Sequence, residues 1–113
     1  LAMSLHFENI RKAIHVMLYD VVEQGFKHSL EFPYDSERAH KIIENANTSL
    51  TNIVNLARKD NLIPNADIKQ EAFRHTIKQA EKTSLQLLSE IQFMRRRQTV
   101  TMHQLEKSDL VSR

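Results

Sequence analysis

The last part of the chain, from Asn65 to Arg113, contains neither glycine nor proline. Within it, apolar residues recur at steps of four, three, seven, four and three positions, which places them on one stripe of an α-helix. These residues are Phe73, Ile77, Ala80, Leu87, Ile91 and Met94. We therefore expect a helix from Asp67 to about Gln98, roughly 45 Å long at 1.5 Å per residue. A helix this long and polar on its other faces is not stable alone in water, so the rest of the chain must cover its stripe.

The first part of the chain predicts a helix with a wide apolar face. Its main row follows the spacing of a heptad seam and comprises Phe7, Ile10, Ile14, Met17 and Val21. A second row beside it comprises Leu18, Val22, Phe26 and Leu30. Ser4 can cap this helix, and Pro33 should end it by about Glu31. Gly25 marks either a close helix crossing or an early end, because glycine costs about 1 kcal/mol relative to alanine inside a helix.

A second helix should follow the turn at Pro33, with Asp35 or Ser36 as its cap. Its expected inward stripe comprises Ala39, Ile43, Ala46, Leu50, Ile53 and Ala57. Half of that stripe is alanine, so the backbone of this helix can approach a neighbour closely. The segment from Asn61 to Asn65 is the second break, and either Asn65 or Asp67 can cap the third helix.

Three long helices separated by two short breaks predict an all-α fold whose neighbouring helices run antiparallel, up-down-up. A chain of 113 residues is enough for one domain, so we assign residues 1–113 to a single helical domain. We interpret residues 1–3 as a cloning remnant or disordered chain, and we expect a frayed tail from about Lys107 to Arg113. Three helices form a thin rod that leaves part of the first helix uncovered. We therefore expect a homodimer, in which a second copy completes a larger bundle.

Composition excludes several functional classes. The chain has no cysteine, which excludes disulfides, thiolate metal sites and cysteine nucleophiles, and which fits a cytoplasmic location. The longest purely apolar runs are short, as at Val16–Leu18, so we expect no membrane-spanning helix. A formal charge of +2 is too small to indicate a polyanionic partner by itself. A single glycine can hardly build a phosphate-binding loop, and we expect no cofactor.

Six histidines raise the question of a metal site. Glu37 and His40 form an E-x-x-H pattern, whose two side chains share a helix face as in di-iron carboxylate bundles. Those bundles need a second such pair, and no second E-x-x-H occurs in the sequence. Glu37 also falls in the first turn of a predicted helix, where an acidic residue is favourable. We therefore expect no metal site, and no residue pair indicates a catalytic one.

Arg95, Arg96 and Arg97 form the most unusual local feature of the sequence. Clustered guanidinium groups can contact nucleic-acid phosphates and release counterions. Successive helical residues point about 100° apart, however, so the three cannot form one flat basic stripe. No aromatic residue follows Phe93 to stack on bases. The alternative interpretation is a favourable placement of cations near a helix C-terminus, or packing of their stems over apolar neighbours.

Arg97 and His103 are separated by five residues. This spacing resembles the R-x(4–6)-H pattern of the HEPN family, which comprises all-helical proteins that include ribonucleases. The resemblance covers only the seven residues from Arg97 to His103. It implies that the arginine and the histidine act together on an RNA phosphodiester, usually across a dimer. The β-branched run from Thr99 to Thr101 weakens the helix on which this pair would sit.

A second resemblance points to a binding protein. Ala13 to Asp20 resembles the start of the helical flagellar export chaperones, Ser36 to Ala57 has a similar texture, and the resemblance ends at Asn61. It suggests a class of small helical proteins that hold a partner's amphipathic helix in a groove. Because no residue pair indicates a catalytic site, we predict a non-enzymatic module for protein–protein interaction or assembly, in which the uncovered apolar face of the first or third helix receives a partner.

The two functional predictions use different residues. The predicted face for a protein partner or a second copy comprises Phe7, Ile10, Ile14, Met17, Val21, Ile91 and Met94. The alternative function is nucleic-acid binding, including a HEPN-like ribonuclease, through Arg95, Arg96, Arg97 and His103.

Overall fold

The computed structural model describes residues 4–111, with side chains up to Lys107. Its elements are α1 (Phe7–Glu31), the 3₁₀ turn η1 (Pro33–Asp35), α2 (Ser36–Asp60) and α3 (Ala66–Val111). The prediction of an all-α chain with three long helices is confirmed, and residues 4–111 contain no strand. Residues 1–3, which we interpreted as a cloning remnant or disordered chain, lie outside the described part.

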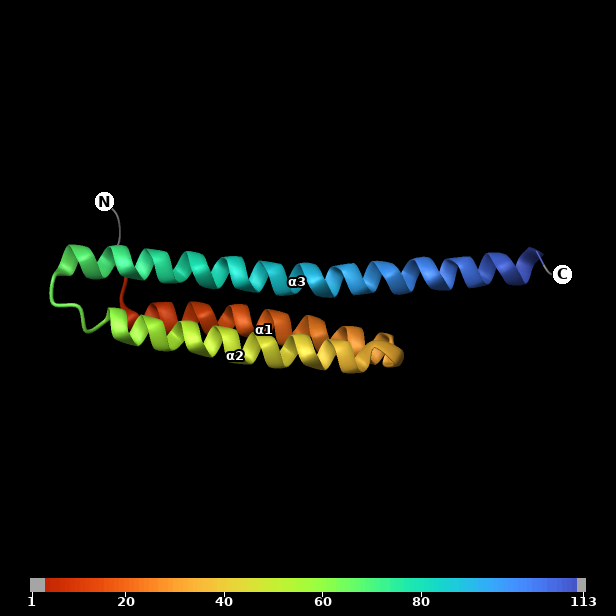
Figure 1. Ribbon diagram of the computed structural model, residues 1–113, viewed down its shortest axis with the longest axis horizontal. Coiled ribbons are helices and arrows are strands. Elements are labelled where there is room, and N and C mark those ends of the chain that lie inside the picture. The colour runs from red at the N-terminus through yellow and green to blue at the C-terminus, as the bar shows by residue number, and fades with distance from the viewer. Residues whose placement is uncertain (1–3, 112–113) are drawn as a thin grey trace.

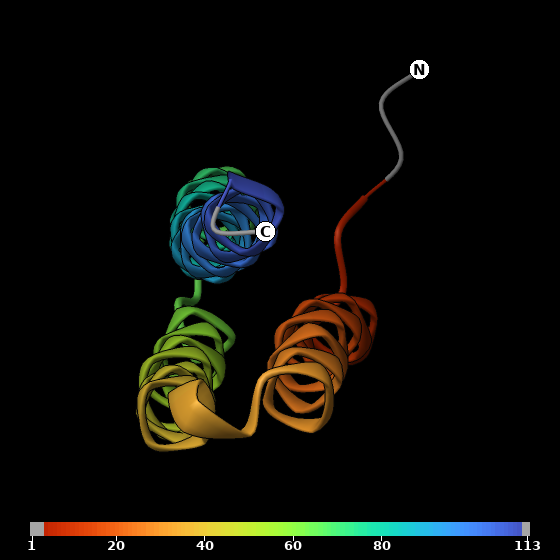
Figure 2. The ribbon, with the colours of Figure 1, turned by 90° about the vertical axis from the view of Figure 1, so that its right-hand side faces the viewer.

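The helices form a long, thin rod. In Figure 1 the chain runs along α1, returns along α2 and reverses again into α3. Seen along the rod in Figure 2, α3 lies over α2, and α1 lies beside α2. The Cα positions extend over 73 × 27 × 14 Å. Because α3 has 46 residues and the other helices have 25 each, its C-terminal part projects beyond the hairpin that α1, η1 and α2 form.

Each helix contributes one apolar stripe to a shared core. The buried apolar residues are Ile10, Ile14 and Val21 on α1, Ala39, Ile42, Ala46, Leu50, Ile53, Val54 and Ala57 on α2, and Phe73, Ala80, Leu87, Ile91 and Met94 on α3. Burying a large apolar side chain completely contributes about 1.5–3 kcal/mol. The stripes predicted from the sequence are therefore the main source of stability, although Phe7, Met17, Ile43 and Ile77 are only half-buried. The predicted second row on α1 is less covered, with Leu18 and Val22 half-buried and Phe26 and Leu30 exposed.

Gly25 lies where α1 and α2 approach closely. A Cβ atom built at this position would lie 2.7 Å from Cγ1 of Ile43, which is shorter than real Cβ contacts. Gly25 therefore marks a close crossing and not an early end, since α1 continues to Glu31. Ile43 fills the space beside Gly25. Ile42, and not Ile43 as predicted, is the residue of α2 that is buried in the core at this level. The inward stripe that we predicted for α2 was wrong by one position here.

The helix starts agree with the sequence in part. α1 begins at Phe7 with His6 in the cap position, and no side chain bonds its free amides, so the predicted cap at Ser4 was wrong. The backbone of Leu5 instead forms two hydrogen bonds with the side-chain amide of Gln70, at 2.7 and 2.8 Å, which hold this segment on α3. At the start of α3 the predicted cap is confirmed, because the Ile68 N–H donates to Oδ1 of Asn65 at 3.0 Å.

The far end of α3 lies at Val111 instead of near Gln98. The hydroxyl groups of Thr99 and Thr101 donate hydrogen bonds of 2.9 Å to the carbonyl oxygens four residues earlier. These bonds are compatible with helical geometry, so the β-branched run does not end the helix. Fraying from Lys107 onward concerns motion and stays a prediction, and residues 112–113 lie outside the described part of the chain.

A buried pair of side chains, the His28–Asp35 clasp, closes the hairpin. Nε2 of His28 lies 2.9 Å from Oδ2 of Asp35, and the imidazole ring is fully buried. Asp35 occupies the predicted cap position of α2 but makes no cap hydrogen bond, because its carboxylate faces His28. The other ring nitrogen of His28, Nδ1, is buried without a hydrogen-bond partner among the described residues. An unpaired buried group of this kind costs about 1–3 kcal/mol, so the clasp must be held by the packing around it.

The clasp also involves α3. Burial raises the pKa of the Asp35 carboxyl, but hydrogen bonds from His28 and Gln98 and the charges of His28 and Arg38 outweigh that effect. The pKa of Asp35 consequently lies below its ordinary value of 3.8. Gln98 belongs to α3, so the same carboxylate joins the closed end of the hairpin to the helix that passes over it.

We predict that Gly25→Ala does not stabilise the wild-type chain, although alanine exceeds glycine in helix propensity by about 1 kcal/mol. The added Cβ would press on Ile43, and overpacking costs about 1–3 kcal/mol. In an Ile43→Ala background the same change should raise the free energy of unfolding by about 1 kcal/mol. Urea denaturation of the four chains measures both effects. Equal effects of Gly25→Ala in the two backgrounds would contradict the close crossing.

A second prediction concerns Asp35 and pH. A carboxyl whose pKa is lower in the folded chain stabilises the fold above its unfolded-state pKa of about 3.9, and this contribution is lost as pH falls through the lower, folded-state value. Asp35→Asn should therefore reduce stability by about 1–3 kcal/mol at neutral pH. Its deficit relative to wild type should shrink below about pH 4.

Thermal unfolding of both chains across the acidic range measures this deficit. Glu44→Gln, which changes an exposed carboxylate on α2, is the matched control and should show no such convergence. A deficit for Asp35→Asn that stays constant into the acid range would contradict a role for the Asp35 charge.

Candidate functional site

The partner-binding face predicted from the sequence is the internal core of the chain. Of its seven residues, the structure buries Ile10, Ile14, Val21, Ile91 and Met94, and half-buries Phe7 and Met17. The seam of α1 is covered by α2 and α3 of the same chain, so it is not an open surface. The sequence shows an apolar seam but does not show whether a neighbour in the same chain or another chain covers it.

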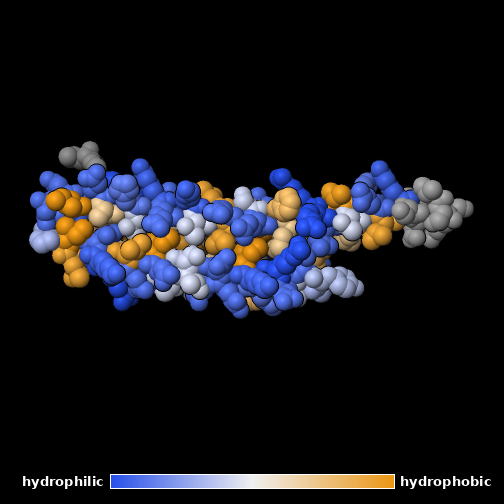
Figure 3. All heavy atoms as spheres, in the orientation of Figure 1, coloured by the Kyte–Doolittle hydropathy of each residue, from blue (hydrophilic) through white to orange (hydrophobic). Residues whose placement is uncertain are grey.

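A groove of about 870 Å³ lies between α2 and α3. Its lining residues are Arg38, Lys41 and Ile42 from α2, and Gln86, Ser89, Glu90, Gln92, Phe93, Met94 and Arg96 from α3. We call this recess the α2–α3 groove. On the face shown in Figure 3, apolar residues gather along the line between α3 and the hairpin, where this groove lies.

Phe93 is the main exposed apolar residue of the α2–α3 groove. It precedes Met94 by one position, which turns it about 100° away from the core stripe. Met94 therefore packs inward with 7% of its surface exposed, whereas Phe93 remains 63% exposed at the groove. Ile42 contributes to the opposite wall and is almost buried. The groove thus combines an apolar floor with one large uncovered aromatic side chain.

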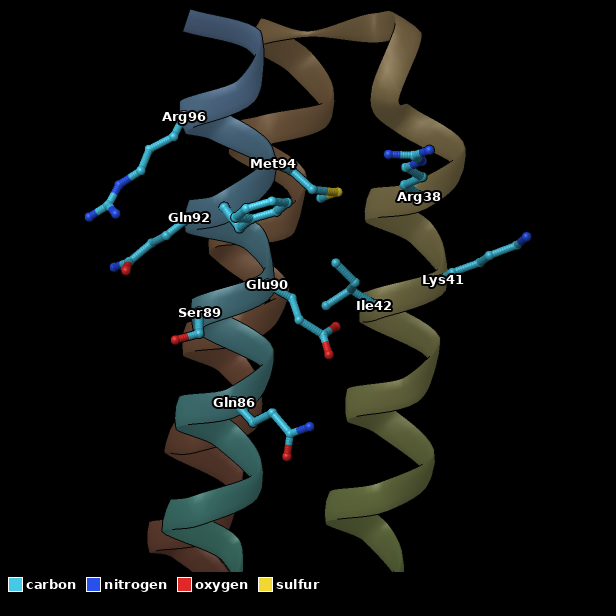
Figure 4. Close-up of a pocket in the computed structure, with 10 residues that line it drawn as sticks. Arg38, Lys41, Ile42, Gln86, Ser89, Glu90, Gln92, Met94 and Arg96 are labelled. Carbon is cyan, nitrogen blue, oxygen red and sulfur yellow. The ribbon is translucent and has the colours of Figure 1, made fainter. Parts of the chain in front are cut away.

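Charged side chains border this floor. Arg38, Lys41 and Arg96 are basic, and Glu90 is the only acidic residue in the lining. In Figure 4, Glu90 extends into the space between the two helices, while Lys41 and Arg96 extend outward on opposite sides. A ligand lying along the groove would therefore have a cation on either flank. The charge of the lining favours a ligand with acidic flanks over one with basic flanks.

The three consecutive arginines point to different surroundings, as their 100° spacing predicts. Arg95 forms an ion pair with Glu31 across the interface between α1 and α3. Arg96 lines the α2–α3 groove. Arg97 lines a separate polar recess of about 240 Å³, together with Asp35 and other residues near the clasp. Only two of the three are therefore available to contact phosphate without breaking an ion pair.

Arg97 and His103 do not share a site within one chain. His103 lines a recess at the end of the hairpin, with Glu31 and Phe32, whereas Arg97 lines the recess beside Asp35. Six positions on a helix correspond to a rotation of about 120° between the two side chains, which explains the separation. The pairing implied by the HEPN resemblance is not formed in the structure of the single chain.

Two exposed residues of α3 were not singled out by our sequence analysis. Met102 and Leu105 are 51% and 64% exposed on the part of α3 that projects beyond the hairpin. The sequence holds the signal that could have identified them, because they continue the core spacing from Met94. The length of the hairpin, which decides that they are uncovered, follows only from the observed ends of the helices.

The described residues show no metal-binding cluster and no bilayer-spanning helix. Among the side chains that are described, no three histidine, aspartate or glutamate residues come together in a way that could hold a metal ion. Glu37 and His40 are both exposed near the start of α2. In the same part of the chain, no helix combines the length and the apolar character needed to cross a membrane.

Comparisons with known proteins add no relative. No protein-family model matches the sequence, and neither the curated proteins nor the solved structures include a match. The surfaces of this chain are therefore the basis for its proposed function.

Proposed function

We propose that this chain is a non-enzymatic interaction module that receives an amphipathic helix of a protein partner in the α2–α3 groove. The observation that carries the proposal is Phe93, which is 63% exposed at a groove of about 870 Å³. Large aromatic residues beside apolar recesses are typical anchors of protein interfaces. Amphipathic helices bind such grooves through apolar residues spaced three and four positions apart.

The dimensions and charge of the groove define the partner. Its wall on α3 extends from Gln86 to Arg96, or about 15 Å at 1.5 Å per residue, which corresponds to nearly three turns of a bound helix. The apolar floor at Ile42 and Met94 would contact one face of that helix. Arg38, Lys41 and Arg96 would then lie near its flanks, so a partner helix with acidic flanking residues fits best.

The homodimer expected from the sequence remains part of this proposal, but through another surface. The seam on α1 lies inside the chain and cannot bind a second copy without unfolding. A dimer built on apolar contacts would use residues that the single chain leaves exposed. Such residues occur at the α2–α3 groove, on the projecting part of α3 and on the outer side of α1.

Nucleic-acid binding is the second candidate function. Its support is that Arg38, Lys41, Arg96 and Arg97 line neighbouring recesses close to an exposed aromatic residue. Two features count against it. Arg95 is paired with Glu31, and the residues that line these two recesses include only two aromatic side chains, Phe93 and Tyr34. A hydrolytic site on RNA has less support, because Arg97 and His103 lie apart.

We predict that a labelled helical peptide, with leucines at heptad spacing and glutamates on its flanks, binds the chain and that Phe93→Glu weakens binding at least tenfold. Phe93→Glu removes the apolar anchor of the groove and adds a negative charge that repels the acidic flanks of the peptide, so both effects weaken binding. Fluorescence anisotropy measures the affinity. Leu85→Glu is the matched control, since Leu85 is 64% exposed on the same helix and does not line the groove. Equal binding by wild type and Phe93→Glu would contradict the proposal.

The same measurement separates the two functions. A short single-stranded RNA and a short duplex DNA should bind weakly at physiological salt compared with the acidic peptide. Nucleic-acid binding that falls steeply with salt, and that disappears when Arg96→Gln and Arg97→Gln are combined, would instead favour the second function. A peptide of the same apolar pattern with lysines on its flanks should bind less well than the acidic one.

A further inference from the structure

The stripe of α3 that enters the core continues beyond the hairpin. From Met94 the same face of the helix passes through Gln98, Met102 and Leu105, at steps of four, four and three. The hairpin stops at η1 while α3 continues (Figure 1). Met102 and Leu105 are therefore about half-exposed or more, although they lie on the core-facing side. We call residues 98–111 the overhang.

A recess lies in the corner where the overhang leaves the hairpin. Its volume is about 360 Å³, and Glu31 and Phe32 at the end of α1 line one side of it. Met102 and His103 are among the residues that line the other side. A helix placed against the overhang would meet this corner end-on and would continue the bundle where α1 and α2 stop.

We propose that a second copy of this chain fills this position, with the two overhangs packed against each other as an antiparallel pair. The length of the overhang indicates this occupant, because 14 residues form a helix of about 21 Å with one apolar stripe. A two-fold axis across its middle lets each overhang cover the stripe of the other. The α3 residues that line the α2–α3 groove end at Arg96, before the overhang begins at residue 98, so the packed stripe of the overhang lies outside the groove.

Charge determines the direction of the pairing. Arg95, Arg96 and Arg97 directly precede the overhang, and in the sequence its far end carries Glu106, Lys107 and Asp109, two acidic residues against one basic residue. A parallel pair would bring the arginine clusters of the two copies together, and like charges repel. An antiparallel pair brings the acidic end of each overhang towards the arginines of the other copy.

The register follows from the two largest apolar side chains. Antiparallel packing is best when Met102 of each copy lies opposite Leu105 of the other. The two-fold axis then repeats this contact, so the exposed Met102 and Leu105 of both copies are covered. The overlap covers about three helical turns of each chain. Such an interface is smaller than the roughly 1,200 Å² of a stable dimer. The dimer should therefore form at high chain concentration and dissociate at low concentration.

Analytical ultracentrifugation of the whole chain, from low micromolar to several hundred micromolar, tests the proposal. The average mass should rise from the chain mass of 13.2 kDa towards twice that value. Leu105→Glu should hold the mass at the monomer value throughout, because the charge would be buried in the pair. Val100→Glu is the matched control: Val100 is 55% exposed on the same overhang but lies off the stripe, so this variant should associate like wild type.

Each other outcome of ultracentrifugation overturns the proposal. A wild-type chain that stays monomeric at every concentration excludes the pairing, and association of Leu105→Glu at wild-type strength places the contact elsewhere. Equal disruption by Val100→Glu and Leu105→Glu also places it elsewhere. Circular dichroism shows whether the variants keep the helix content of wild type. Peptide binding at Phe93 is measured in a separate experiment, so either proposal can fail while the other stands.

Oxidative cross-linking tests the direction of the pair and does not depend on a destabilising change. The chain has no cysteine of its own. Met102→Cys should form a disulfide between copies, because the two positions lie about 5 Å apart along the helix axes in this register. Gln98→Cys lies on the same stripe, but its two positions are about 16 Å apart and should not react. Cross-linking at both positions would indicate a parallel pair. Cross-linking at neither position would exclude the pairing.

Discussion

Close packing against the small residues of α2 is the constraint on which the rest of the structure depends. α2 contacts both other helices, and its Ala39, Ala46 and Ala57 are fully buried. Gly25 supplies a similar small surface on α1, next to Ile43. Because these residues have short side chains, the backbones can lie close together. The larger side chains of α1 and α3, such as Ile14 and Phe73, then fill the space between the three helices.

The His28–Asp35 clasp marks the point along α3 where this packing stops. It lies at the turn between α1 and α2 and reaches Gln98 on α3, which is the first residue of the overhang. Core-forming residues of α3 before this point are covered by the hairpin, and residues 99–107 after it are exposed. The position of one buried pair therefore separates an intramolecular core from a surface that continues the same apolar pattern.

Periodicity predicted the elements of this fold well, because long stretches without glycine or proline leave few alternatives to helix. Most of the inward stripe of α3 also followed from the sequence, whereas the structure was needed to choose between a close crossing and an early end at Gly25. The cap predicted at Ser4 failed because Leu5 bonds to the distant side chain of Gln70, a contact that local sequence does not encode. The end of α3 was placed too early because the β-branched run from Thr99 to Thr101 predicts a weakened helix, whereas the hydroxyl bonds of Thr99 and Thr101 are compatible with helical geometry.

The candidate surfaces were harder to predict than the helices. A heptad seam looks the same whether its partner helix belongs to the same chain or to another, so the predicted binding face on α1 proved to be core. Phe93 falls outside the stripe of α3, and only the position of α2 gives it a groove. Residue spacing determines the face of a helix, but the lengths of the neighbouring helices determine which part of that face is covered.

The unbroken course of α3 has a consequence for regulation. Phe93 and Met102 belong to one continuous helix, so the rotation of that helix about its axis orients both side chains together. A ligand that prefers one orientation at the groove would also change the free energy of pairing between overhangs. Such coupling is reciprocal, and pairing would change the affinity of the groove by the same factor. If binding at the groove rotates α3, helix continuity couples the two proposed surfaces without a separate hinge between them.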